Sequence, residues 1–259
     1  GAGITNKLVL CDDVAAAHTT TPGLSEIDYS GSGGAGFEVN DTITDWTSAE
    51  RVVSGKVELN DFDMLVPTKK QIVKDDVKHQ AYHSHKSYEL YETPADFRKD
   101  EGRGKRLVRV RAEAEAVHFK IRQGATASRR LSTGYTFKLK DGPEGENNEY
   151  VVIGATHYLR PASTHRMEPT RLVKERGTMD YPESMENMDY LCYFKALEKK
   201  TPFRSPRKTP WPAISGLHTA IVVGPSGEEI YADDHGRIKV EFHWDRDGKK
   251  DEKTTCWVR

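Results

Sequence analysis

The sequence predicts a mainly β protein with one or two short helices, and three observations support this. Several segments alternate apolar and polar residues with the period of two that a half-buried strand requires, most clearly residues 235–250, HGRIKVEFHWDRDGKK. Two apolar runs, GYTFKL (134–139) and EYVVIGATHYL (149–159), flank the turn-rich segment DGPEGENN. Clusters of Gly, Pro, Asn and Asp divide the remaining runs into short pieces.

The first part of the chain follows this pattern. KLVLC (7–11) is a short apolar run, and residues 56–60 place Val57 and Leu59 on one face of an expected strand. Pro67 closes this segment. We therefore expect a first region of β structure over residues 1–75.

Residues 107–124, LVRVRAEAEAVHFKIRQG, are compatible with two structures. Alternation of Val108 and Val110 with arginines indicates a strand, whereas the content of Ala, Glu and Arg favours a helix. We predict a helix near residues 105–116 and a strand that starts at Val117.

A change of composition predicts a domain boundary. Residues 199–218 combine prolines with basic residues, a composition typical of a stiff connector. We expect a linker there, preceded by a second β region over residues 76–198 and followed by a third over residues 219–259. The second region either follows the first or is interleaved with it. The linker holds Pro202, Pro206, Pro210 and Pro212 with Lys199, Lys200, Arg204, Arg207 and Lys208.

The stretch 235–250 also gathers a histidine, a tryptophan and two aspartates, as a catalytic or metal site does. In a strand, however, Phe242 and Trp244 point to one face and His243 to the other, so these groups cannot converge. Asp247 and Gly248 fit the tip of the following turn, and TTCWVR fits the returning strand. We therefore predict a β-hairpin whose residues Ile238, Val240, Phe242 and Trp244 face a core.

Composition excludes several classes of function. The 259 residues include 39 Lys and Arg against 40 Asp and Glu, and a net charge of −1 provides no general attraction to nucleic acid or to a membrane surface. Three widely separated cysteines indicate neither a zinc site nor a disulfide framework. No apolar run approaches the ~18 residues of a membrane span, so we expect no stable membrane anchor.

Two polar clusters resemble metal sites. Asp61 and Asp63 form a DxD pattern without a nearby third carboxylate or phosphate-binding loop, and we expect no metal there. His79, His83 and His85 cannot all converge within one regular element, which favours a solvated connecting segment. A metal-dependent hydrolase that uses these histidines is kept as an alternative.

The C-terminal segments VVGPSGEEI, HGRIKVEFHWDRDGKKDEK and CWVR resemble the signature of the VgrG family, the spike components of type VI secretion systems. In that family they form a turn, a hairpin and a strand at the start of an oligonucleotide/oligosaccharide-binding (OB) type β-barrel. The signature and expected core positions are Gly224, Pro225, Gly227, Glu228, Gly236, Arg237, Val240, Phe242, Trp244, Asp245, Arg246, Cys256 and Trp257.

Upstream segments extend the resemblance over essentially the whole chain. TPFRSPRKTPWPAISGLHTA resembles the family's linker, and GKVELNDFDMLVP and YELYETPADF resemble parts of its phage-hub-like region. The resemblance implies one or two hub-like β-barrel domains followed by the start of an OB-type barrel. Family members begin further upstream and continue beyond CWVR, so we expect an internal piece of a longer protein.

The resemblance implies a mechanical function. Members of the family are homotrimers that cap a tube of Hcp hexamers, carry a PAAR-type tip protein, and contact baseplate and effector proteins. They assemble in the bacterial cytoplasm and are then secreted into the medium or into target cells. We accordingly expect no enzyme activity, no catalytic or metal-binding residues and no cofactor.

Two alternatives remain beside the hydrolase. A phage-type baseplate hub belongs to the same structural class. An OB-type module could instead bind single-stranded nucleic acid, which requires aromatic residues on an exposed basic face. Phe242 and Trp244 share the apolar face of their strand, and we therefore expect no nucleic-acid partner.

Overall fold

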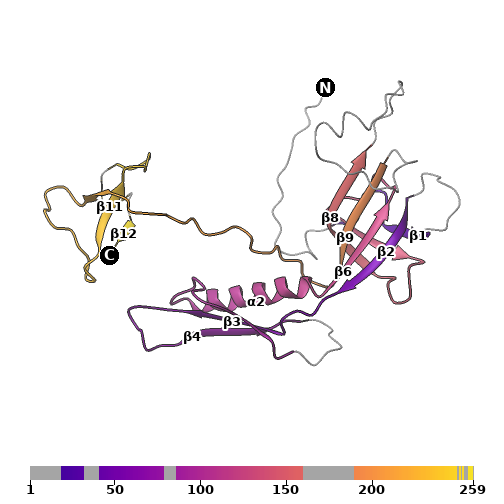
Figure 1. Cartoon of the computed structure of the whole chain (residues 1–259), viewed down its shortest axis with the longest axis horizontal. Coiled ribbons are helices and arrows are strands. Elements are labelled where there is room, and N and C mark those ends of the chain that lie inside the picture. Colours follow the sequence, from indigo (N-terminus) through magenta and orange to yellow (C-terminus); the bar gives the residue numbers. More distant parts are fainter. Residues whose placement is uncertain are drawn as a thin grey trace, which may run out of the picture. The chain divides into compact units, whose positions relative to one another are not determined.

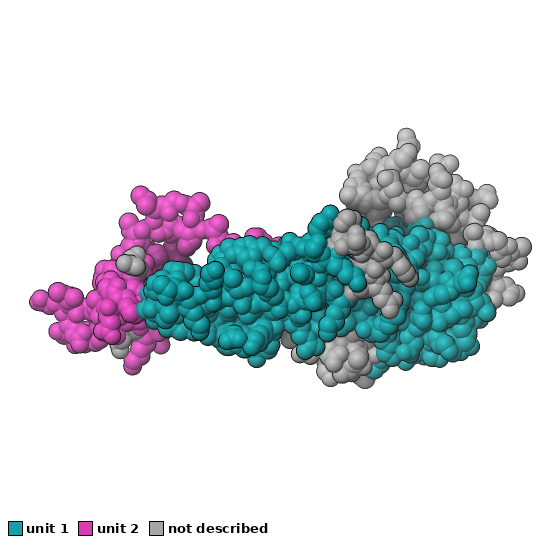
Figure 2. All heavy atoms as spheres, turned by 90° about the horizontal axis from the view of Figure 1, so that it is seen from below, with its two compact units in different colours: residues 1–206 teal, residues 207–259 magenta. Residues whose placement is uncertain are grey.

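The structure is a computed structural model, and it describes residues 19–31, 41–78, 86–159, 190–249, 251, 253 and 256–258. The chain forms two compact units, residues 1–206 and 207–259 (Figure 2). The division falls inside the Pro-rich segment 199–218. Strands dominate the described part of the chain, which holds one α-helix, so the prediction of a mainly β protein is confirmed.

Six strands of the first unit close into a barrel (Figure 1). Around the barrel their order is β1-β2-β6-β9-β8-β7, and β1 pairs in parallel with both β2 and β7, whereas the other pairs are antiparallel. Both expected hub regions contribute strands, two from residues 1–75 and four from residues 76–198. The strands are β1 (Glu26–Tyr29), β2 (Thr42–Glu50), β6 (Lys120–Thr126), β7 (Thr136–Lys140), β8 (Glu149–Leu159) and β9 (Tyr190–Glu198).

Aromatic side chains fill the barrel. Trp46 contacts Tyr150 with ring centroids 4.9 Å apart, and Phe137 meets Phe194 edge to face at 5.9 Å. These rings are buried together with Ile27, Ile43, Leu131 and Leu139. Because aromatic rings bury large areas and prefer such tilted contacts, this cluster supplies most of the apolar core of the barrel.

Beside the barrel, the first unit contains a three-stranded sheet covered by the helix. β3 (Lys56–Asp61) lies between β4 (Gln71–Asp76), its antiparallel partner, and β5 (Glu89–Glu92), its parallel partner. The helix α2 (Glu101–Val117) packs on β3 and β4 (Figure 1). A separate core between helix and sheet contains Val57, Leu59, Val73, Phe97, Val108 and Ala112.

The helix predicted near residues 105–116 is present and is longer than predicted. Asp100 caps its first turn by accepting a hydrogen bond from the Arg103 amide at 2.8 Å. Val108 and Ala112 are buried, whereas Val110 is 39% exposed, so the buried stripe follows the helical period rather than the strand-like alternation. The predicted strand start at Val117 is wrong, because Val117 ends the helix and β6 begins at Lys120.

The second unit contains a three-stranded antiparallel sheet of order β10-β11-β12. Its strands are β10 (Ala220–Val223), β11 (Ile238–Phe242) and β12 (Cys256–Val258). Val240 is the Cα partner of Val222 on one side and of Cys256 on the other. The pairing of β11 with β12 confirms the predicted hairpin. Gly248 lies in its turn, where a Cβ atom would stand 2.5 Å from the Glu241 carboxyl carbon.

Two glycines of the barrel provide a matched test of core packing. A Cβ atom on Gly124 would lie 2.5 Å from the ring of Phe194, which is 2% exposed, whereas one on Gly154 would meet nothing within 4 Å. We expect Gly124→Ala to lower the free energy of unfolding by about 1–3 kcal/mol, because the buried ring has to move. Gly154→Ala should change it by less than about 0.5 kcal/mol. Urea denaturation of both variants measures the difference, and equal losses would contradict this packing.

Candidate functional site at a buried ion-pair cluster

The most heavily charged interior site of the described chain lies at one end of the barrel, around Arg122 of β6. Its side chain is 3% exposed. The Nε atom donates a hydrogen bond to Glu146 at 2.9 Å, and a terminal nitrogen pairs with Glu198. Tyr150 donates its hydroxyl hydrogen to the same Glu146 carboxylate at 2.7 Å, and Arg122 also lies over the Tyr150 ring at 5.3 Å. The ion pairs of Arg122 and the aromatic core of the barrel therefore meet at the Tyr150 side chain.

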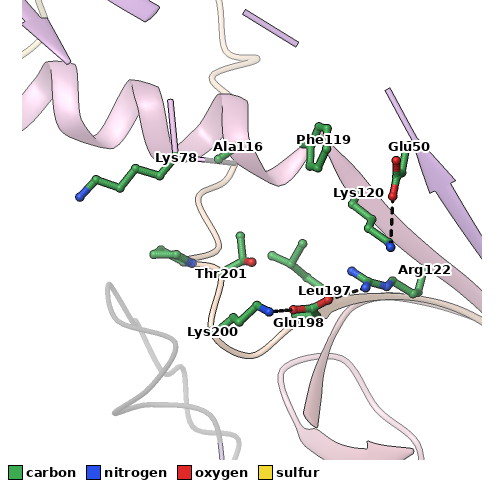
Figure 3. A pocket seen from close by; sticks show the side chains of 11 residues that line it. Glu50, Lys78, Ala116, Phe119, Lys120, Arg122, Leu197, Glu198, Lys200 and Thr201 are labelled. Carbon is green, nitrogen blue, oxygen red and sulfur yellow. Dashed lines mark hydrogen bonds and ion pairs between the residues drawn. The ribbon is translucent and has the colours of Figure 1, made fainter. Parts of the chain in front are cut away.

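Two lysines extend this ion-pair cluster. Lys120 Nζ lies 3.1 Å from Glu50 of β2, and Lys200 Nζ lies 2.6 Å from Glu198 (Figure 3). Lys120 Nζ also lies 3.4 Å from Glu146. The cluster thus connects β2, β6, β9 and the turn that precedes β8. We define the ion-pair cluster as Glu50, Lys120, Arg122, Glu146, Tyr150, Glu198 and Lys200.

The strand geometry explains why Arg122 points inward. Side chains alternate across a strand, and Gly124 of β6 lies opposite Trp46 and Phe194, which belong to the barrel core. Arg122, two residues before Gly124, therefore faces the same interior. Sequence reasoning missed this site, because the alternation of Arg122 with Ile121 is consistent with Arg122 lying on the solvent face.

Two carboxylates of the cluster, Glu146 and Glu198, are held ionised. Burial raises the pKa of Glu146, but hydrogen bonds from Arg122 and Tyr150 outweigh it, so that pKa lies below its ordinary value. The pKa of Glu198 is lowered in the same way, with Lys200 and Arg122 outweighing burial. Burial and the hydrogen bond to Glu146 raise the pKa of the Tyr150 hydroxyl, which stays protonated.

A cavity of about 560 Å³ adjoins the cluster (Figure 3). One part of its wall is apolar, with Ala116, Phe119 and Leu197, and the other part is charged. Lys120, Arg122 and Lys200 each face a carboxylate, and the described lining includes no histidine or cysteine. These ion pairs neutralise charge inside the barrel and join strands that are distant in the sequence.

The two aspartates of the DxD pattern have structural partners. Asp61 accepts a hydrogen bond from the Phe62 amide, and Asp63 accepts one from the Leu65 amide at 3.0 Å, so both carboxylates order the loop after β3. His79, His83 and His85 lie outside the described residues. Within the described ranges, no group of three or more His, Cys, Asp or Glu side chains is arranged to hold a metal ion.

The thiol of Cys192 gives no further candidate site. Cys192 is buried in the barrel, and burial raises the pKa of its thiol to about 11. A thiol of this kind stays protonated near neutral pH and is a poor nucleophile. Cys256 of β12 is exposed.

The signature residues lie in turns and strands of the second unit. Pro225 and Glu228 close one turn through a backbone hydrogen bond of 3.2 Å, with Gly227 at φ +89°. Arg237 donates to Asp233 at 2.6 Å, and its hydrogen bonds lower the pKa of Asp233 to about 2. Gly224 and Gly236 belong to these turns, Asp245 and Arg246 lie in the connection from β11 to β12, and Val240, Phe242, Cys256 and Trp257 belong to the strands.

One expectation about the hairpin needs correction. Trp244 is 59% exposed, and the buried residue of β11 is Glu241, which is 8% exposed and lies on the opposite face. Phe242 and Trp244 stack on each other with centroids 5.1 Å apart. The physical reasons are that β11 ends at Phe242, which places Trp244 in the turn after it, and that no second layer among the described residues of this unit covers that face. The opposite face is not simply solvated either, because Lys239 lies over the Trp257 ring.

Comparison with known proteins assigns the family. Residues 2–162 match the phage tail baseplate hub (GPD) family, and the chain belongs to this family. It is 30% identical over 253 residues to the type VI secretion system spike protein VgrG1b of Pseudomonas aeruginosa, and 30% identical over 254 residues to VgrG1a of the same organism. Each match covers 97% of the chain, but only 32% of VgrG1b and 36% of VgrG1a. The chain therefore spans about a third of the length of these spike proteins.

Solved structures include more distant similarities. A 43 kDa tail protein of prophage MuSo2 from Shewanella oneidensis matches with a TM-score of 0.42 and 10% identity, covering 71% of this chain and 45% of that protein. An E. coli component of the type VI secretion system matches with a TM-score of 0.40 and 21% identity, covering 61% of this chain and 37% of that one. No helix in the described part of the chain is long and apolar enough to cross a membrane.

Removal of the central cation tests the ion-pair cluster. Arg122→Met removes the main partner of the buried Glu146 carboxylate and one of the two partners of Glu198, and we expect a loss of about 3–5 kcal/mol in the free energy of unfolding. Lys105→Met is the matched control, because Lys105 pairs with Glu101 on the surface, with both side chains about 70% exposed. It should cost less than about 0.5 kcal/mol. Chemical denaturation at pH 7 compares the two, and a similar small loss for both would refute the role of Arg122.

The same cluster predicts a dependence on pH. Because the pKa values of Glu146 and Glu198 are lowered on folding, their contribution to stability is complete above their ordinary value of 4.5 and is lost as the pH falls through the lowered values. In Arg122→Met, burial raises the pKa values of Glu146 and Glu198 with less opposition, so these carboxylates take up protons at a higher pH. The stability gap between the original protein and this variant should therefore narrow as the pH falls from 7 to below 4. Thermal melts across this range measure the gap, and a gap that widens would contradict the assignment.

Proposed function

We propose that this chain is the hub part of a type VI secretion spike and acts mechanically, without enzyme activity. The observation that carries the proposal is the match to VgrG1a and VgrG1b over 97% of the chain, together with membership of the baseplate hub family. The ion-pair cluster supports it from the structural side, since its charged groups are committed to one another and to barrel closure.

In this proposal the protein is a homotrimer that caps the Hcp tube. It carries a PAAR-type tip, contacts baseplate and effector proteins, assembles in the cytoplasm and leaves the cell by type VI secretion. A particle driven through an envelope requires stiffness and a slow rate of unfolding. A closed barrel with an aromatic core and an internal ion-pair cluster supports that requirement.

The second unit is proposed to form the first strands of an OB-type barrel after the linker 199–218. Its apolar face supports this, because Val222 and Trp244 are about 60% exposed and Val240 and Phe242 lie on the same face. Another layer of sheet on this face would bury them, and the signature positions Phe242 and Trp244 would then become core residues.

The oligomeric state is the direct test. For the protein as its gene encodes it, mass-resolved light scattering at micromolar concentration should give three times the mass of one chain. A trimer fits a subunit whose exposed apolar surface is completed by its neighbours. A stable monomer over the same concentration range would contradict the proposed hub.

A further inference from the structure

The hairpin loop between β3 and β4 exposes a continuous run of apolar side chains. Phe62 is 63% exposed, and Met64, Leu65 and Val66 are each 45–46% exposed. We call these four residues the apolar tip. Pro67 follows and is exposed as well, so no polar side chain is exposed from residue 62 to residue 67. The tip lies at the end of the three-stranded sheet that is remote from the barrel (Figure 1). Exposed apolar residues gathered in this way mark a binding surface.

Two buried aspartates hold the apolar tip in place. Asp61 and Asp63 are 7% and 8% exposed. Asp61 accepts a hydrogen bond from the Phe62 amide at 2.8 Å, and its second oxygen accepts one from the Arg98 amide. Asp63 accepts one from the Leu65 amide at 3.0 Å. Because the loop is already ordered, little conformational entropy is lost when the tip binds.

The backbone of the tip is also paired within the loop. The Val66 amide donates to the Asp63 carbonyl at 3.1 Å, and the Val66 carbonyl accepts from the Lys69 amide at 3.0 Å. Of the six residues 62–67, three thus donate their amide inside the loop, and Pro67 has no N–H group. A protein surface can supply missing partners, whereas the interior of a lipid layer cannot. Pairing inside the loop therefore favours a membrane as the partner.

Basic residues surround the apolar tip. The Arg98 amide bonds to Asp61 and Lys99 pairs with Asp63, so residues 96–106 lie beside the loop. Residues 61–70 and 96–106 hold seven basic and five acidic residues, and two of the acidic ones are the buried aspartates. Their exposed surface is thus positive, in a chain whose net charge is −1. The exposed charged residues are Lys69, Lys70, Arg98, Lys99, Arg103, Lys105 and Arg106 against Asp96, Asp100 and Glu101.

We propose that the apolar tip inserts into the surface of a membrane rich in anionic phospholipid, with the surrounding lysines and arginines at the level of the phosphate groups. Burial of apolar side chains and attraction of cations to anionic lipid both contribute to interfacial binding of this kind. The contact is peripheral and reversible, and it requires no membrane-spanning helix. It goes beyond the proposed hub function, because it depends on this loop and not on the trimer.

Vesicle sedimentation of the protein as its gene encodes it tests the contact. Binding to vesicles of phosphatidylglycerol and phosphatidylethanolamine in equal parts should be at least about tenfold tighter than binding to phosphatidylcholine vesicles. Phe62→Ser should weaken the binding to anionic vesicles at least about fivefold, because it removes the most exposed ring of the tip. Val52→Ser is the matched control and should leave the binding unchanged, since Val52 is 64% exposed but lies in the connection from β2 to β3.

The role of the cations is tested separately. Lys69→Gln/Lys70→Gln should weaken binding to anionic vesicles at least about fivefold and should lower its sensitivity to salt. Lys78→Gln/Lys86→Gln removes the same charge at the opposite end of the three-stranded sheet and should change the binding less than about twofold. All of these side chains are exposed, so thermal melts of the variants should coincide with that of the original protein.

Fluorescence quenching measures insertion directly. A fluorescent amino acid in place of Leu65 should be quenched by phospholipids that carry a spin label on the acyl chain. The same amino acid in place of Val52 should not be quenched.

The outcomes are distinct. The proposal is overturned if the original protein does not bind anionic vesicles, or if binding survives both Phe62→Ser and the lysine substitutions. Binding that depends on the lysines alone, without quenching at position 65, shows adsorption rather than insertion and also overturns it. The apolar tip would then be assigned to a protein partner. The proposed hub is unaffected by these results, because light scattering measures the trimer independently.

Discussion

Arg122 is the constraint on which the rest of the first unit depends. A guanidinium placed inside a barrel loses its hydration, and that loss is offset only when several acceptors surround it. Glu146 and Glu198 provide those acceptors from the turn before β8 and from β9, and Lys120 extends the network to Glu50 of β2. The strands must therefore be in register at this end for the charges to be matched. Barrel closure and charge neutralisation occur together.

The barrel and the helix-covered sheet of the first unit are joined close to the ion-pair cluster. The C-terminal end of α2, through Ala116, and Phe119 after it line the cavity beside the ion-pair cluster. The helix also belongs to the core it shares with β3 and β4. Val117 at the end of α2 packs against Val151 and Leu197 of the barrel, so force applied to the helix would reach the barrel through packed side chains, as the proposed mechanical role requires.

The two units differ in how completely they bury their apolar residues. The barrel encloses its aromatic rings, whereas the three-stranded sheet of the second unit leaves one apolar face uncovered among the described residues. Exposed apolar patches of this kind mark surfaces that bind other protein.

The sequence by itself determined the mainly β class, the helix before β6, the β11–β12 hairpin and the family, because alternation, turn residues and the signature around Trp244 are local properties of the chain. It did not determine that Arg122 faces the barrel interior, since its partners Glu146 and Glu198 are 24 and 76 residues away and are brought to it only by strand pairing. Nor did it determine the exposure of Trp244. A strand's pattern shows which side chains share a face, but only the tertiary structure decides whether another layer covers that face.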